Sequence, residues 1–68
     1  MSMKVYKKIT LVGTSENSME EAIKNAIAKA SETLRGLSWF EVKEVRGRIE
    51  GGKVKEFQVV LEVGFEVE

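Results

Sequence analysis

The last segment of the chain is the sequence feature that most restricts its fold. Apolar side chains occupy every second position of this segment, and the positions between them are mostly polar. The apolar positions are Phe57, Val59, Leu61, Val63, Phe65 and Val67. Because successive side chains of a β-strand point to opposite faces, this alternation predicts a strand over 53–67 with one face in the core and the other in solvent.

Residues 18–36 follow a helical pattern instead. Ser18 and Glu21 fit a capping box, in which Ser18 accepts a hydrogen bond from the third helical N–H and Glu21 reaches back to the N–H of Ser18. Apolar residues then recur at steps of three and four, namely Met19, Ala22, Ile23, Ala26, Ile27, Ala30 and Leu34. The pattern predicts an amphipathic helix of about eighteen residues that ends at a left-handed Gly36.

Two further segments are predicted to be strands. Residues 4–14 alternate in part, and residues 38–50 are separated from the last segment by the hairpin signal Gly51-Gly52. The predicted fold class is therefore α+β, with the order β-α-β-β and a three-stranded antiparallel sheet wrapped around one helix. Residues 1–68 are expected to form a single domain.

The alternation within 38–50 shifts by one residue near Lys43-Glu44, which indicates a β-bulge. With this bulge, one side of the strand faces the helix and carries Phe40, Val42, Val45 and Ile49. The other side faces away and carries Trp39, Glu41, Glu44, Arg46 and Arg48.

The hairpin loop sets the register of this strand. A loop of three residues is expected to place Val45 opposite Phe57, and Glu44 opposite Gln58. A strict two-residue loop is rejected because it would turn the charged side chain of Arg46 toward the core.

The small size of the chain indicates that it needs additional stabilisation. A domain of 68 residues is marginal alone, and without Cys or His it has neither disulfides nor the usual zinc ligands. No EF-hand spacing is present, so no metal site is predicted, although a calcium or magnesium site made of carboxylates alone stays open. Strands of about twelve residues reach about 40 Å, whereas the predicted helix covers only about 27 Å. One helix cannot cover such a sheet, and self-association is expected.

Charge and composition exclude several classes of function. Lys+Arg and Asp+Glu are both 11, so no broad basic field is available for nucleic acid. No apolar run approaches a membrane span and no signal peptide opens the chain, which predicts a cytoplasmic protein. Without His or Cys, and with no Ser or Lys beside a base at readable spacing, an enzyme is not expected.

Trp39, the only tryptophan, is left facing away from the predicted core. Such a residue is either an anchor between subunits or a stacking platform for a flat aromatic ligand. Gln58, predicted on the same face, offers a donor and an acceptor to the edge of a heterocycle. Arg46 and Arg48 could bind a phosphate. The residues alone leave both alternatives open.

Four segments in this order resemble the dodecins, which are small flavin-binding proteins that assemble as hollow dodecamers. The segments are VYKKITLVGTS, the amphipathic helix, WFEVKEVRG and EFQVVLEVGFE, and they cover nearly the whole chain. The resemblance implies that Phe40 enters the core and that Trp39 stacks on a flavin ring. Two such tryptophans from symmetry-related subunits would enclose a pair of flavins.

The resemblance also implies roles for the remaining polar residues. Gln58 falls on the glutamine that hydrogen-bonds the polar edge of the ring, and Glu44 on an acidic position that lines the pocket. Arg46, and less directly Arg48, fall where a phosphate would bind. The expected function is storage and photoprotection of FMN, with riboflavin or FAD as alternatives. Two other readings stay open, which are a self-assembling structural domain without flavin and a binder of another nucleotide-like cofactor such as coenzyme A.

Overall fold

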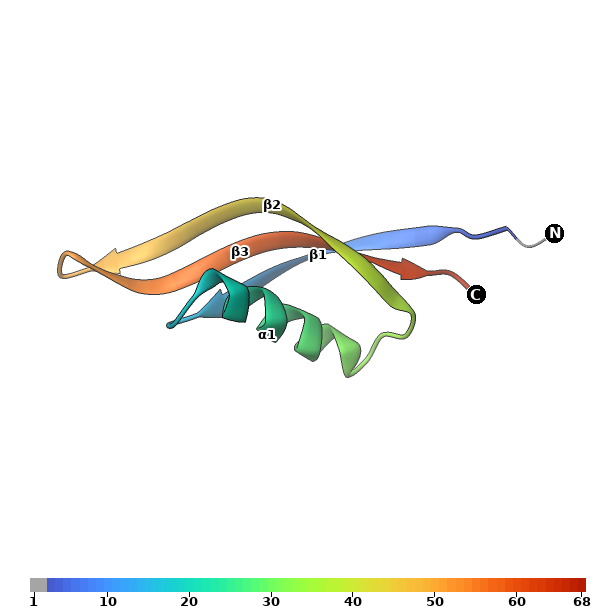
Figure 1. Ribbon diagram of the computed structural model, residues 1–68, viewed down its shortest axis with the longest axis horizontal. Coiled ribbons are helices and arrows are strands. Elements are labelled where there is room, and N and C mark those ends of the chain that lie inside the picture. Colours follow the sequence, from blue (N-terminus) through green and yellow to red (C-terminus); the bar gives the residue numbers. More distant parts are fainter. Residues whose placement is uncertain (1–2) are drawn as a thin grey trace.

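The chain forms one helix and three antiparallel strands in the predicted order β-α-β-β (Figure 1). The structure is a computed structural model that describes residues 3–68. Its elements are β1 (Tyr6–Ser15), α1 (Met19–Ser31), β2 (Leu37–Glu50) and β3 (Lys53–Glu66). The spatial order of the strands is β1-β3-β2. The segment with the regular alternation is therefore the central strand, which has hydrogen-bonded neighbours on both edges.

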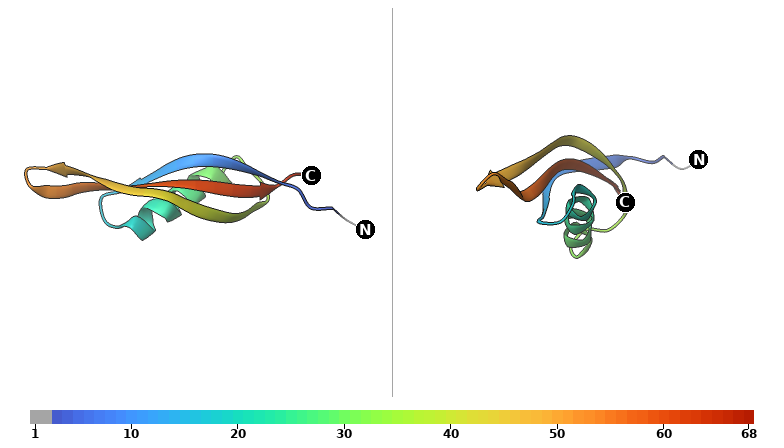
Figure 2. Two further views of the ribbon diagram at one scale, coloured as in Figure 1. Left: turned by 90° about the horizontal axis from the view of Figure 1, so that it is seen from above. Right: turned by 60° about the vertical axis from the view of Figure 1, so that its left-hand side comes forward.

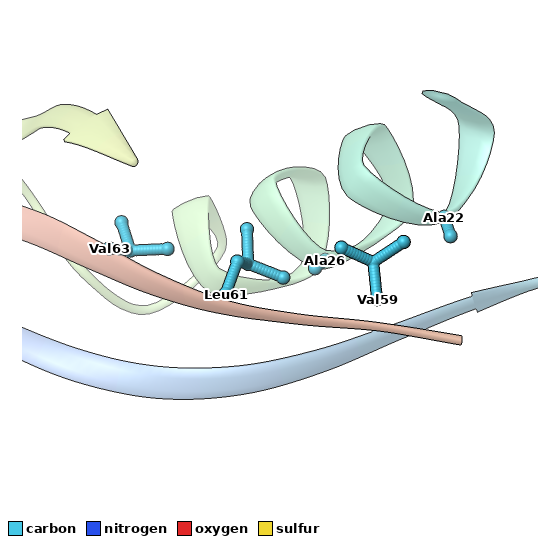
Figure 3. Close-up of a cluster of buried hydrophobic side chains, with 5 residues drawn as sticks. All are labelled: Ala22, Ala26, Val59, Leu61 and Val63. Carbon is cyan, nitrogen blue, oxygen red and sulfur yellow. The ribbon is translucent and has the colours of Figure 1, made fainter. Parts of the chain in front are cut away.

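The core lies between β3 and one face of α1 (Figure 3). Val59, Leu61 and Val63 are at most 1% exposed, which confirms the middle of the predicted core face of the last strand. The prediction was wrong for Val67, which lies beyond the end of β3 and is 48% exposed. On the helix, Ala22 and Ala26 face them, and these small side chains allow a close approach. Partly buried residues extend the cluster, namely Ile9, Leu11, Ile23, Ile27 and Leu37.

The N-terminus of α1 confirms half of the predicted capping box. The Ser18 hydroxyl accepts from the N–H of Glu21 at 3.0 Å, as expected. Glu21 does not reach back, because the Ser18 N–H already donates to the hydroxyl of Ser15 at 3.3 Å. The Glu21 carboxylate instead accepts from the Ser15 hydroxyl and from the Asn17 side-chain amide. These two hydrogen bonds hold the pKa of Glu21 below its usual range.

The helix is shorter than predicted. It has 13 residues and ends at Ser31, so the expected length of about eighteen residues was wrong. The N–H groups of Thr33 and Leu34 both donate to the carbonyl of Ala30, which tightens the chain into a turn although the apolar pattern continues to Leu34. Gly36 does adopt a left-handed φ of 75°, but it leads the chain into β2, and its carbonyl accepts from the Glu66 N–H.

The predicted β-bulge in β2 is confirmed. Val42 lies opposite Leu61 and Glu44 lies opposite Val60, so Lys43 is the extra residue. The prediction of a three-residue hairpin loop was wrong, since Glu50 pairs with Lys53 and only Gly51-Gly52 form the turn. Both glycines have a positive φ, as a tight two-residue turn requires.

A second irregularity explains why Arg46 still faces outward. Arg48 pairs with Glu56 and Ile49 with Val54, so one residue of β3 is passed over between them. This restores the parity that a two-residue loop would have lost, but it shifts the partners. The predicted pairs were therefore wrong, because Val45 lies opposite Val59 and Glu44 opposite Val60.

The apolar side of β2 is not covered by the helix. Phe40, Val42 and Val45 lie on the helix side of the sheet, opposite the three core residues of β3. The helix α1, however, packs on β1 and β3. The β2–β3 hairpin also extends beyond the helix (Figure 2). Phe40 remains 46% exposed, so the expectation that it enters the core of the subunit was wrong. A single chain leaves a row of apolar side chains in solvent.

Candidate functional site

Trp39 lies on the face of the sheet that is turned away from α1. Its register partner on the central strand is Gly64, whereas the next residue, Phe40, pairs with the core residue Val63. The predicted division of the two neighbouring aromatic residues between the two faces of the sheet is therefore confirmed. The side chain of Trp39 is 40% exposed.

The indole ring of Trp39 lies face-on over the backbone of Gly64. A Cβ added to Gly64 would be 2.5 Å from each of three consecutive ring atoms of Trp39, Cε2, Cζ2 and Cη2. A point equally distant from three consecutive atoms of a planar six-membered ring lies on the axis through the centre of that ring. The Cα of Gly64 therefore points at a ring face, and the opposite face of the indole is directed away from the sheet.

Two further contacts surround this ring on the same face. Tyr6 of β1 is tilted by 55° against it, with 5.8 Å between the ring centroids. Lys8, which pairs with Gly64 from the other side, extends its ammonium group to the carboxylate of Glu41 at 3.0 Å. This ion pair raises the pKa of Lys8 and lowers the pKa of Glu41, in each case through the hydrogen bond and the attraction of opposite charges.

A second polar cluster occupies the same face nearer the hairpin. Gln58 pairs with Arg46 across the strands, and its side-chain carbonyl accepts from Nε of Arg46 at 2.8 Å. Its amide donates to Glu56 at 2.9 Å, while Nη1 of Arg46 lies 3.2 Å from the carboxylate of Glu44. Arg48 lies opposite Glu56 at the hairpin end of this group. Four of the five predicted site residues are thus neighbours on one face, which the corrected register still allows because the parity is unchanged.

Trp39 is far from this cluster within one subunit. Gly64, the partner of Trp39, and Gln58 are six residues apart on β3. At the rise of an extended strand this separation is about 20 Å. A ring stacked on Trp39 is therefore too far away to contact Gln58 of the same subunit.

Gly64 and Tyr6 are site residues that sequence reasoning missed. A glycine inside a strand is a known sign that another group approaches the backbone closely. Gly64 stands inside the otherwise regular alternation of the last segment, so this signal was present. Tyr6 carries no such signal, because its approach to Trp39 depends on the order of the strands.

Two features are absent from residues 3–68, which are the residues that the structure describes. In this part of the chain no group of three or more Asp or Glu side chains is placed to hold a metal ion. Nor does the described helix have the length and apolar character needed to cross a membrane.

The fold and the face just described define a class of small β-α-β-β subunits with an exposed aromatic platform. The family model described as Dodecin matches residues 5–68. A dodecin from Thermus thermophilus is 65% identical over 65 residues, which is 96% of this chain and 94% of the relative. The chain belongs to the dodecin family, which comprises small binding proteins.

Solved structures agree with this assignment. A crystal structure of a Thermus thermophilus protein superposes with a TM-score of 0.93 at 64% identity and covers 97% of both chains. The dodecin from Streptomyces coelicolor has a TM-score of 0.95 at 48% identity and covers 100% of this chain and 97% of its own.

Proposed function

We propose that this protein binds flavin by stacking the ring system on the exposed indole face of Trp39. The observation that carries the proposal is the flat orientation of Trp39, which lays one ring face on Gly64 and leaves the residue 40% exposed. An indole that lies flat on a sheet turns one whole ring face outward. A flat aromatic ligand gains both apolar burial and favourable stacking on such a plane.

The site is completed by other copies of the chain. Gln58 and Arg46 have the donors and acceptors that suit the polar edge and the phosphate of FMN. They are about 20 Å from Trp39 along the strand, too far for one ring system to reach both within a subunit. A flavin on Trp39 therefore receives these contacts from a neighbouring subunit, and a second flavin, stacked on the Trp39 of a symmetry-related subunit, can cover its other face.

Self-assembly is supported independently by the shape of the subunit. The radius of gyration is 14.2 Å, against about 11 Å for a compact chain of this length. The accessible surface is 5162 Å², against about 4,300 Å² for a compact monomer of this mass. Together with the uncovered apolar side of β2, these values favour a closed homo-oligomer, and family membership makes the dodecamer our choice.

The proposed role is storage and protection of flavin in the cytoplasm, without catalysis. An indole in contact with the flavin ring can donate an electron to the excited state and so quench it. A pair of flavin rings enclosed between two indoles also leaves little room for a substrate. FMN is favoured over riboflavin because the guanidinium of Arg46 can exchange its contact with Glu44 for a phosphate. Coenzyme A is the alternative ligand for this arginine.

Replacement of Trp39 by Ala tests the proposal. FMN and riboflavin are titrated into ligand-free protein while flavin fluorescence and native mass are followed. Wild-type protein should quench the emission. Trp39→Ala should lose about one hundredfold in affinity, since each flavin loses both the apolar burial and the stacking contact with its indole. The native mass should not change.

The same measurement separates this function from a purely structural one. If Trp39→Ala dissociates the oligomer, the residue is an anchor between subunits instead of a stacking platform. Full flavin emission at saturating wild-type protein contradicts flavin binding altogether.

A further inference from the structure

The flat orientation of the Trp39 indole needs a physical cause. Side chains on a strand usually stand roughly perpendicular to the sheet, and exposed side chains exchange between rotamers rapidly. Gly64 allows the ring to lie down, because it has no Cβ to collide with the ring face. Open space permits this orientation but does not favour it over an upright one. A second contact must select it.

Tyr6 makes that contact from the far side of the central strand. It pairs with Glu66, two residues from Gly64 and so on the same face of the sheet. The indole extends from β2 across Gly64 and meets the phenol ring of β1 at a centroid distance of 5.8 Å and an angle of 55°. Tilted aromatic pairs at such distances attract one another. An upright indole would move away from the sheet and lose this contact.

We propose that Tyr6 is a positioning residue that holds the Trp39 indole flat and thereby presents its free face to the ligand. The ligand part of this inference rests on the proposed function, whereas the flat indole does not require a ligand. An aromatic pair of this kind favours one orientation by about two- to tenfold. If the ligand stacks on the flat orientation, the apparent affinity falls with the population of that orientation when the pair is removed, which is by up to the same factor.

The test uses the ligand-free oligomer and the emission of its single tryptophan. Tyr6→Leu removes the ring, and Tyr6→Phe keeps the ring but removes the hydroxyl. Lys7→Ala is the matched control, because Lys7 is the next residue of β1 and points to the other face. Two quantities are measured for each variant, which are the quenching of Trp39 by acrylamide and the dissociation constant for FMN.

We expect Tyr6→Leu to make Trp39 more accessible to acrylamide and to weaken FMN binding by up to about tenfold. Tyr6→Phe and Lys7→Ala should match the wild type in both quantities. Unchanged accessibility and affinity in Tyr6→Leu overturn the proposal. An equal loss in Tyr6→Phe also overturns it, because the hydroxyl would then act on the ligand directly.

Two further measurements keep the test decisive. If Tyr6→Leu does not fold, Tyr6→Val removes the same ring with a side chain that is favourable in a strand, and it must increase acrylamide quenching. In the wild type, the short distance requires that Tyr6 transfers its excitation to Trp39, so strong tyrosine emission contradicts the pair without any variant. If the wild type does not bind FMN, the proposed function fails, while acrylamide quenching still decides whether Tyr6 positions the indole.

Discussion

At the scale of single residues, two neighbouring aromatic side chains point to opposite faces of the sheet, and their surroundings depend on the residue that lies opposite each of them. Trp39 and Phe40 are both large and aromatic, but one faces Gly64 and the other Val63. Gly13 shows the same dependence in the core, since a Cβ there would be 2.0 Å from the carbonyl oxygen of Ala22. At both glycines, a missing side chain admits another part of the chain.

Gln58 provides the prediction at this scale. We expect Gln58→Ala to weaken FMN binding by about ten- to a hundredfold, because a buried polar edge of the ligand loses its hydrogen-bond partner. Fold and native mass should be unchanged, since Gln58 faces away from the core. Gln58→Glu should weaken binding further where the ring presents a carbonyl, because an ionised carboxylate cannot donate.

Isothermal titration with FMN, together with the native mass of each variant, measures both effects. Equal affinity for the wild type and both variants would place the ligand elsewhere. Loss of folding would contradict the outward orientation of Gln58. Thr14→Ala, at the residue that pairs with Gln58 from β1, is the matched control for the loss of a polar side chain on this face.

At the scale of elements, the sequence predicts what depends on periodicity and misses what depends on local competition. The core face of β3 and the bulge at Lys43 follow from the parity of the apolar residues alone. The hairpin loop was wrong because a second irregularity near Arg48 restores the parity, and two compensating shifts leave the faces unchanged. The alternation therefore predicts which face of the sheet each side chain occupies, but it does not predict which residue of the neighbouring strand lies opposite.

The ends of the helix follow the same rule. Its apolar stripe continues through a turn that is no longer helical, so the stripe overestimates the length. At the other end, Ser15 competes with Glu21 for the N–H of Ser18, and this competition is visible only in three dimensions. The Trp39 site is the clearest case, because the meeting of Tyr6, Gly64 and Trp39 requires the strand order β1-β3-β2.

The cap at Glu21 gives a pH-dependent prediction at this scale. Its pKa is lowered in the folded chain by hydrogen bonds from Ser15 and Asn17. The carboxylate therefore stabilises the fold at pH values above its unfolded pKa of about 4.3, and this contribution is lost as pH falls through the folded pKa. Stability should decrease on acidification, and part of this decrease should be absent in Glu21→Gln.

Urea unfolding of both proteins at a series of pH values checks this prediction. Ion pairs with lysines lower the pKa values of Glu20 and Glu41 too. The informative quantity is therefore the difference in the free energy of unfolding between the wild type and Glu21→Gln. That difference should be largest near neutral pH and should shrink in acid. A difference that is independent of pH would show that the charge of Glu21 does not contribute.

At the scale of the whole molecule, a single subunit leaves part of its sheet without a covering layer. Its extents are 57 × 21 × 14 Å, and one short helix covers only part of the sheet. An apolar groove lies between α1 and β2, where Ile23, Ile27 and Phe40 line it. The exposed side of β2 continues from this groove toward the hairpin. Burying these side chains between subunits supplies stability that a chain of this size lacks alone.

Val42 tests whether this surface holds the oligomer together. Val42 is 44% exposed in the subunit, so a charge there is tolerated by a single chain. Between subunits the same charge would be buried without a partner, which costs several kcal/mol per contact and is repeated at every symmetry-related interface. Val42→Glu should therefore give species of low mass, with an unfolding midpoint below that of the wild type.

The control is Lys43→Glu, which alters the charge of the adjacent bulge residue without adding a charge to the apolar side. Light scattering coupled to size exclusion measures the mass of both, and a wild-type mass for Val42→Glu would exclude the apolar side of β2 as the contact between subunits.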